Sequence, residues 1–361
     1  MVIWNKLLFM VVFSLVSIGK ASAQEKKDSV WIQTNDGCKV YNPSPAKNES
    51  ITWTGACVNG YATGEGTLIW YKNGKRGQEY VGALKRGITH GYGKYTYEGG
   101  SSYEGHYVNG QEEGKGRYRR LENNVLTYTY VGDYSNGDPE GVGVEVLYEY
   151  GDTASCYTGS FVKGVKHGRG TGMARDGSFD VVYAGVFVDD RLEDDRSDIK
   201  EYAEGNLIRH YTGGFHDHAR TGFGIEIAGL NKYEGQWSRN MKNGTGKLFY
   251  NGVVIYDGEW LDDKLDGIGT RIFLDGSQYR GQFKKNERHG YGIVRWKDGA
   301  QYIGEFKKDL FAGQGYTVYR DDRLNTSGIW EKGSLTVPLN IVTVRKELDS
   351  RYKEVIQRLK N

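Results

Sequence analysis

Rings and glycines recur at fixed positions along most of the chain. The segment from Tyr233 reads YEGQWSRNMKNGTGKLFYNG, and the same pattern starts again at Tyr256, Tyr279 and Tyr302, every 23 residues. Because side chains alternate between the two faces of an extended strand, positions 1, 3 and 5 of this unit share one face. The glycine at position 3 leaves a gap between two rings, so the pattern predicts a strand whose rings lie on bare backbone.

The second half of the unit predicts another strand. Glycines stand at positions 12 and 14, and position 18 is often aromatic, as in Trp70, Tyr97, Tyr250, Phe273, Trp296 and Tyr319. Rings of one strand are expected to cover the glycines of its neighbour. Turn-forming pairs stand between units, at Asn73-Gly74, Asp176-Gly177, Asn251-Gly252, Asp275-Gly276 and Asp298-Gly299. Each unit is therefore predicted to be a β-hairpin.

Tracing the pattern gives twelve units, of which the last is truncated and the one at Tyr183 lacks its glycine pair. They start at Trp53, Tyr80, Tyr103, Tyr130, Tyr157, Tyr183, Tyr211, Tyr233, Tyr256, Tyr279, Tyr302 and Thr326. The pattern, Y-x-G-x-W/F followed by G-x-x-x-G-x-G, resembles the membrane occupation and recognition nexus (MORN) repeat over residues 53 to about 333. The resemblance implies protein–protein interaction, self-association and, for some members, contact with membrane lipids, and it implies no reaction.

Stacked hairpins define the expected fold. A lone hairpin is barely stable, so equivalent hairpins are expected to extend one sheet. The predicted fold class is all-β, an elongated, single-layer, twisted antiparallel sheet of tandem hairpins over residues 53–334, with the unit at 183–210 degenerate. Residues 24–52 are predicted to be an N-terminal cap segment, in which Ser29 to Val40 adds a strand or covers the first hairpin.

Residues 335–361 are predicted to be a C-terminal cap that contains a short helix. Five apolar residues between Lys346 and Lys360 fall on one helical face, namely Leu348, Tyr352, Val355, Ile356 and Leu359. We expect this helix to cap the last repeat. An amphipathic helix that contacts a membrane or a partner is the alternative.

The N-terminus is typical of a signal peptide over residues 1–23. An apolar run from Leu7 to Ile18 follows Lys6 and precedes Ala21-Ser22-Ala23, so cleavage is expected after Ala23, with an uncleaved anchor as the alternative. The mature chain then holds 46 basic and 46 acidic residues, since Lys6 and Lys20 are lost from the 48 basic residues. Near-neutral charge argues against a nucleic-acid partner. The expected location is the periplasm or the cell exterior, with a bacterial source favoured.

Three cysteines allow at most one internal bridge. In an oxidising compartment, Cys38 with Cys57 is the favoured pair, with Cys156 left over; isolated thiols are the alternative.

Residues for catalysis or metal binding do not form a recognisable motif. The acids between Asp189 and Asp198 are interrupted by arginines and do not have the spacing of an EF-hand loop, and His210, His216 and His218 have no carboxylate arrangement or cysteine partner that would complete a ligand set. Nucleophile elbows and metalloprotease motifs are absent from the sequence. We therefore expect no enzyme activity, no cofactor and no metal.

A single-layer sheet leaves its rings partly unshielded, which predicts a binding groove. The candidate groove residues are Tyr233, Trp237, Tyr256, Trp260, Tyr279, Phe283, Trp296, Tyr302 and Phe306. A protein partner in the cell envelope is the leading hypothesis, with membrane lipid or cell-surface polysaccharide as alternatives and self-association also open. In the competing interpretation the rings only join neighbouring hairpins.

The array predicts an extended particle. At ~4.8 Å per strand and two strands per unit, twelve units would span on the order of 110 Å. Small-angle scattering of the mature chain should give a radius of gyration well above the ~21 Å of a globular chain of this length. A value near ~21 Å would contradict the predicted architecture.

Overall fold

The computed structural model describes residues 31–319 and 324–360. They form two compact units. Of the described residues, unit 1 comprises those up to Glu193 together with Glu201–Asn206, and unit 2 comprises Asp194–Lys200 and those from Leu207 onward. The predicted signal peptide, residues 1–23, lies outside the described residues.

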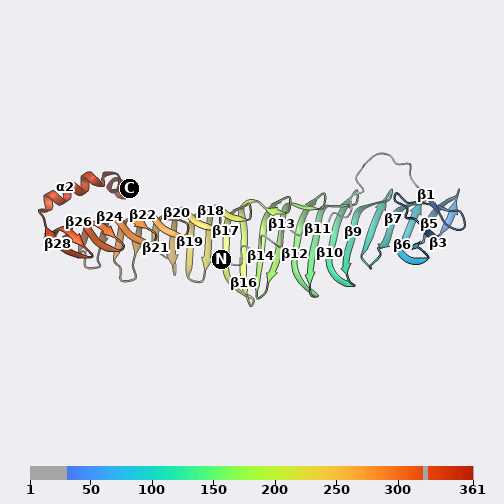
Figure 1. Cartoon of the computed structure of the whole chain (residues 1–361), viewed down its shortest axis with the longest axis horizontal. Coiled ribbons are helices and arrows are strands. Elements are labelled where there is room, and N and C mark those ends of the chain that lie inside the picture. The colour runs from blue at the N-terminus through green and yellow to red at the C-terminus, as the bar shows by residue number, and fades with distance from the viewer. Residues whose placement is uncertain (1–30, 320–323, 361) are drawn as a thin grey trace. The chain divides into compact units, whose positions relative to one another are not determined.

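Unit 1 is built from strands that follow one another in chain order (Figure 1). They are β1 (Trp31–Gln33), β2 (Lys39–Tyr41), β3 (Glu49–Trp53), β4 (Ala56–Val58), β5 (Tyr61–Lys72), β6 (Lys75–Lys85), β7 (Ile88–Thr96), β8 (Ser102–Val108), β9 (Gln111–Glu122), β10 (Val125–Ser135), β11 (Asp138–Glu149), β12 (Asp152–Val162), β13 (Val165–Asp176), β14 (Phe179–Val188) and β15 (Arg191–Leu192). From β5 to β15 each strand pairs antiparallel with the next. Strand β16 (Asp194–Ala203) is divided between the two units.

Unit 2 continues the same meander and ends in helices. Its strands are β17 (Asn206–His216), β18 (Ala219–Ala228), β19 (Asn231–Ser238), β20 (Met241–Tyr250), β21 (Val253–Leu261), β22 (Lys264–Ile272), β23 (Gln278–Lys284), β24 (Glu287–Arg295), β25 (Gln301–Lys307), β26 (Leu310–Val318), β27 (Leu324–Glu331) and β28 (Ser334–Pro338), followed by α2 (Ile341–Arg351) and α3 (Lys353–Lys360). Successive strands again pair antiparallel. The predicted fold class, an antiparallel sheet of tandem hairpins with a helical C-terminus, is confirmed.

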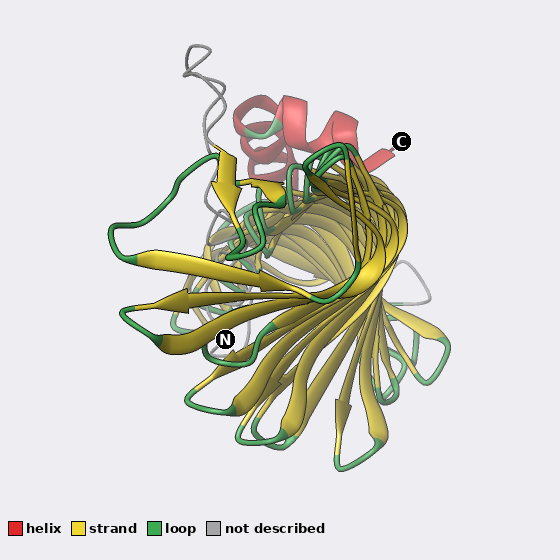
Figure 2. Ribbon diagram, turned by 90° about the vertical axis from the view of Figure 1, so that its right-hand side faces the viewer, coloured by secondary structure: helices red, strands yellow, loops and turns green. Residues whose placement is uncertain are grey.

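The strands of unit 1 that lie nearest the viewer in Figure 2 turn progressively relative to one another. This twist is the ordinary consequence of strand chirality, and it is expected in a sheet that has no second sheet to flatten it.

Eight repeats, those that start at Tyr80, Tyr103, Tyr130, Tyr157, Tyr211, Tyr233, Tyr256 and Tyr279, carry a β-bulge at position 4 of the first strand. In the unit of Tyr233, Gly235 faces Gly246 across the strands and Trp237 faces Lys242, with a register shift between these two pairs. The bulge leaves the residue at position 4, here Gln236, without an opposing partner in the ladder. Its carbonyl is thereby freed for another donor.

The second strand of each unit has glycines at positions 12 and 14, and the two are required for different reasons. Gly244, at position 12, has φ +93, a left-handed conformation that side-chain-bearing residues rarely adopt. Gly246, at position 14, has an ordinary conformation but no room, because a Cβ there would lie 2.4 Å from Oη of Tyr233. One glycine is therefore needed for the backbone and the other for the ring.

Two kinds of tight turn join the strands. Asn73-Gly74 and Asn251-Gly252, predicted as turns between units, have positive φ at both residues, as in type I′ hairpins. The turn within each unit, at positions 7 and 8, has the same conformation, as at Asp262 (φ 49°) and Asp263 (φ 64°). Oδ1 of Asp263 accepts a hydrogen bond from the amide of Lys242 in the preceding unit at 2.8 Å. Successive turns are thus linked by side chains as well as by the sheet.

The N-terminal segment is fastened to the edge of the array. Strand β2 pairs with β5 through Lys39 and Tyr61, and β4 pairs with the same part of β5. A disulfide joins Cys38 to Cys57, with 5.7 Å between their Cα atoms, and Cys156 is a free thiol. The favoured pairing of the three cysteines is therefore confirmed.

The C-terminal helices differ from the prediction in number and placement. The helical segment starts at Ile341 and is broken at Tyr352 into two helices. The predicted apolar face packs on the sheet, against Ile268, Tyr291, Ile293, Ile303 and Tyr316. These residues belong to β22, β24, β25 and β26, so the helices cover the sheet face of several repeats. The sequence predicts a helix that caps the last repeat; α2 does lie against β27 of that repeat, but the two helices also cover strands of earlier repeats.

The glycine under the tyrosine ring gives a stability prediction. Gly246→Ala should cost about 3 kcal/mol or more, because neither the ring nor the facing backbone can move away. Gly252→Ala is the matched control: its Cβ would meet nothing within 4 Å, so only the strain of φ +77 remains, about 1 kcal/mol. Denaturant unfolding with hydrogen exchange of β19–β21 measures both variants. Equal losses for the two substitutions would contradict the packing argument.

Candidate functional site

The predicted groove residues form a closed column of rings. Eight of the nine, all except Trp296, are buried, with exposures from 0% for Tyr279 and Tyr302 to 6% for Trp260. Each tyrosine packs edge-on against the position-5 ring of its own unit and that of the next. The ring centroids of Tyr256 lie 5.2 Å from those of Trp260 and 5.4 Å from those of Phe283. The face of the sheet that carries positions 1, 3 and 5 is hereafter called the ring face.

The tyrosine hydroxyl uses the carbonyl that the bulge frees. Tyr256 donates to the carbonyl of Glu259 at 2.8 Å, and Tyr279 to that of Gln282 at 2.8 Å. The same bond, from position 1 to position 4, is made by Tyr80, Tyr103, Tyr130, Tyr157, Tyr211, Tyr233 and Tyr302. In the first unit, Nε1 of Trp53 donates to the carbonyl of Ala56, so tryptophan replaces tyrosine there. The buried polar group of each ring is thus satisfied.

Side chains at position 10 cover the column. This position faces position 5 across the strands, and in four units it holds a cation. Lys166, Arg220, Lys242 and Arg288 lie 5.2, 4.0, 5.0 and 5.4 Å from the ring centroids of Tyr157, Trp237, Tyr233 and Phe306. Cations are attracted to the negative faces of aromatic rings, so this contact is favourable.

The open aromatic row predicted for Tyr233, Trp237, Tyr256, Trp260, Tyr279, Phe283, Tyr302 and Phe306 is therefore wrong. Glycines below, neighbouring rings on both sides and position-10 side chains above leave these residues no free face. Rings at position 1, and not those at position 18, cover the glycines. The competing interpretation, in which these rings join neighbouring hairpins, holds for the column.

Rings at position 18 remain accessible. Trp296 is half-buried and lines a shallow hollow of about 530 Å³ with Tyr319, which is 46% exposed. In unit 1, Trp70 and Tyr97 flank Tyr95, with ring centroids 5.5 Å and 4.7 Å from that of Tyr95. These three half-buried rings form one wall of a second cavity.

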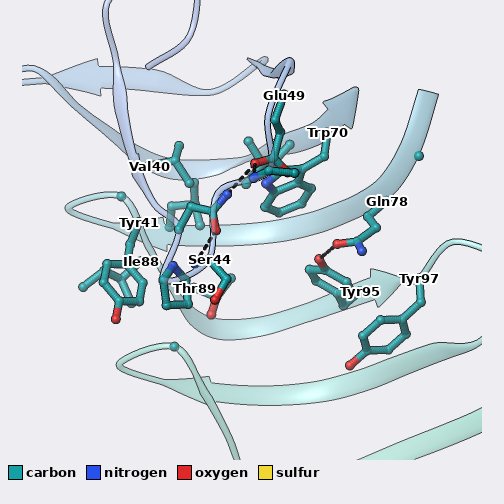
Figure 3. Close-up of a pocket in the computed structure, with 18 of the residues that line it drawn as sticks. Val40, Tyr41, Ser44, Glu49, Trp70, Gln78, Ile88, Thr89, Tyr95 and Tyr97 are labelled. Atoms are coloured by element: carbon teal, nitrogen blue, oxygen red, sulfur yellow. Dashed lines mark hydrogen bonds between the residues drawn. The ribbon is translucent and has the colours of Figure 1, made fainter. Parts of the chain in front are cut away.

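The cavity of unit 1 has a volume of about 430 Å³ and lies on the ring face (Figure 3). The loop that follows β2 closes it on one side, where Asn42 donates to Oε2 of Glu49 at 2.8 Å. On the facing side Tyr95 donates to the side-chain oxygen of Gln78. Glu112, at position 10 of the unit of Tyr103, lines the floor together with Tyr107.

Two polar groups of this cavity, the carboxyl of Glu112 and the hydroxyl of Tyr107, lack a counter-charge or a hydrogen-bond partner among the described residues. Burial raises the pKa of Glu112 and the nearby charge of Asp138 adds to this, whereas a hydrogen bond from its own backbone amide lowers the pKa in part. The hydroxyl of Tyr107 is buried and has no hydrogen-bond partner among the described residues. Burial, followed by the charge of Glu112, raises the pKa of this hydroxyl strongly, so it is neutral and able to donate or accept.

The acids and histidines around residue 200 make pairwise contacts within unit 2. Nε2 of His210 lies 3.1 Å from Oδ1 of Asp198, and Nε2 of His216 lies 2.8 Å from Oδ1 of Asp195. Within the described ranges, no group of three or more histidine, cysteine or carboxylate side chains is placed to hold a metal ion. Across residues 31–319 and 324–360, no helix combines the length and the hydrophobicity needed to cross a bilayer.

Tandem hairpins with a column of packed rings in each compact unit define a repeat protein. The MORN repeat model matches nine segments, which together cover more than half of the chain: residues 80–102, 103–120, 130–149, 157–177, 211–228, 233–254, 256–278, 279–301 and 302–322. The chain therefore belongs to the MORN repeat family. No curated protein matches its sequence. The nine matched units are the nine in which tyrosine donates to the position-4 carbonyl, and repeats of this kind serve as scaffolds for protein or membrane interaction.

Sequence reasoning missed the residues that line the cavity. Tyr95, Tyr107 and Glu112 belong to regular repeat positions, so nothing in the motif distinguishes them. One signal was available: position 10 carries an acid in the unit of Tyr103, whereas four other units carry a cation there. The loop from Asn42 to Glu49 precedes the array, and its approach to the ring face follows only from the tertiary structure.

The buried hydroxyls predict a specific response to alkali. Burial raises the pKa of Tyr157 to about 12 and raises that of Tyr233 and Tyr256 as well, against about 10 in an unfolded chain. Their contribution to stability is complete below pH ~10 and is lost as the pH rises toward the folded values, since only the unfolded chain then releases protons. Phenolate absorbance of the native protein should lag behind that of the denatured protein above pH ~10. Superimposable titration curves would refute the burial of these hydroxyls.

Proposed function

We propose that this protein is an exported, non-enzymatic scaffold of the cell envelope that binds a protein partner through the aromatic cavity of unit 1. The observation that carries the proposal is the contrast between two sets of rings. The rings of the column are buried against one another and against glycines, whereas Trp70, Tyr95 and Tyr97 present accessible ring surface around a cavity of about 430 Å³. Aromatic residues in a preformed concavity supply contact area at a small cost in conformational entropy.

The architecture supports a binding role. Antiparallel hairpins bonded to both neighbours place the cavity walls on a rigid scaffold, and the disulfide between Cys38 and Cys57 fastens the segment that leads into the closing loop. Preorganised walls reduce the entropy lost on binding. The bridge also supports export, because disulfides form and persist in oxidising compartments.

A protein partner is favoured over lipid by the form of the site. The accessible rings are recessed behind the loop of Asn42 to Glu49, and the cavity wall carries Glu49 and Glu112. Acidic side chains oppose attachment to anionic lipid headgroups, and the mature chain has no net basic charge to offset them. An extended segment of a protein can insert side chains into such a recess.

Site-specific photo-crosslinking in the native organism tests the proposal. A photoreactive residue at Lys72, which is exposed at the cavity, should capture a discrete protein, whereas one at Val142, which is 58% exposed on the opposite sheet face of the same unit, should not. Fractionation of the same cells should place the protein in the envelope. Equal capture at both positions, capture at neither, or binding to liposomes or envelope polysaccharide in place of a protein would overturn the proposed function.

A further inference from the structure

Position 10 provides an internal comparison for the cavity. Units of identical geometry place Lys166, Arg220, Lys242 or Arg288 over the rings, where a cation is favoured. The unit of Tyr103 instead places Glu112 there, opposite Tyr107 in the ladder. A carboxylate beside the negative faces of rings is unfavourable. The charge at position 10 of this unit is therefore opposite to the charge that the rings favour and that four other units carry.

Nothing in the described parts of the chain neutralises this carboxylate. Glu112 forms no ion pair and no hydrogen bond to another side chain within residues 31–319 and 324–360; its own backbone amide favours the charge, and the nearby charge of Asp138 opposes it. By contrast, Glu145, which is 9% exposed, is paired with Lys166 at 2.6 Å. A partly buried carboxylate with no cation beside it is costly, which points to a cation that the chain itself does not supply.

The hydroxyl of Tyr107 provides a second, independent observation. The residue is 4% exposed, lines the cavity and is the position-5 ring that faces Glu112, yet its Oη has no partner among the described residues. Buried hydroxyls are nearly always hydrogen-bonded in native proteins. A donor that entered beside Glu112 would satisfy both groups.

We propose that the cavity binds an organic cation, an alkylammonium or guanidinium group, in the position that the array elsewhere gives to its own lysines and arginines. Glu112 pairs with the charge, Tyr107 accepts a hydrogen bond from it, and Trp70, Tyr95 and Tyr97 provide ring faces along its stem. The inference rests on the proposed function in taking a basic side chain of a protein partner as the source of this cation. The chemistry of the site is the same for a free amine.

Calorimetry on the full mature chain tests the chemistry with defined probes. N-acetyl-lysine methylamide and N-acetyl-arginine methylamide represent a partner's side chain, n-butylammonium represents a free amine, and N-acetyl-norleucine methylamide is the uncharged counterpart. Each cation that fits should bind at least about tenfold more tightly than the uncharged probe, the gain expected for one charge-assisted contact. Preference for the amino-acid derivatives identifies a side chain as the source, and preference for n-butylammonium identifies a free amine.

Variants separate the site from general effects of charge. Glu112→Gln should weaken cation binding by about tenfold, and Tyr107→Phe by roughly threefold. Glu112→Lys should abolish binding and raise the melting temperature, because its ammonium takes the place that Lys242 takes in its own unit. Glu65→Gln, an exposed acid of unit 1 outside the cavity, removes the same charge and should leave binding unchanged.

The outcomes distinguish this inference from the proposed function. Equal binding of the cationic and uncharged probes, or equal effects of Glu112→Gln and Glu65→Gln, would overturn the cation site. If crosslinking at Lys72 still captured a protein in the Glu112→Lys background, the proposed function would stand without the cation site. If the probes bound as expected while crosslinking captured nothing, the cation site would stand and the protein-binding role would fall.

Discussion

The whole array depends on a tyrosine ring laid across two glycines. At position 1 the ring covers the backbone of its own strand and of the facing strand, as Tyr233 covers Gly235 and Gly246. Its hydroxyl then reaches the carbonyl that the bulge at position 4 leaves free, at 3.0 Å in this unit. Each feature requires the others: without the glycine the ring has no room, and without the bulge the buried hydroxyl has no acceptor. Repetition of this arrangement makes every hairpin fit its neighbours.

A filled ring face decides where function can reside. The residues that define the repeat are occupied with one another, so they stabilise the sheet and offer no surface to a ligand. The binding role that we propose therefore uses positions that the motif leaves variable, such as position 10 and position 18. Glu112, Trp70 and Tyr97 are residues of this kind, and they meet where the segment before the array closes over the ring face. In the binding role that we propose, stability and recognition thus belong to different positions of one repeat.

The opposite face of unit 2 is used in another way. Apolar residues at positions that alternate with the rings, among them Tyr291 and Ile293, are covered by Leu348 and Leu359 of the C-terminal helices. Glu305 accepts hydrogen bonds from Arg351 and from the hydroxyl of Tyr352, which fixes the helices across several strands. The helices therefore shield a second apolar surface that a single-layer sheet would otherwise expose.

The sequence alone determined the hairpin unit, its period, the turns at Asn73-Gly74 and Asn251-Gly252, and the apolar face of the C-terminal helix, because these depend on short-range alternation and on backbone conformations that few residues adopt. The sequence could not predict the burial of Tyr256 and Trp260, since the exposure of a side chain depends on which residues of the next hairpin pack on it. The sequence also could not predict the cavity, because Glu112, Trp70 and the loop at Asn42 are distant from one another in the chain. Only the tertiary structure brings them to one side of the sheet. There the acidic side chain at position 10 faces a cavity lined by rings, which the local sequence pattern does not reveal.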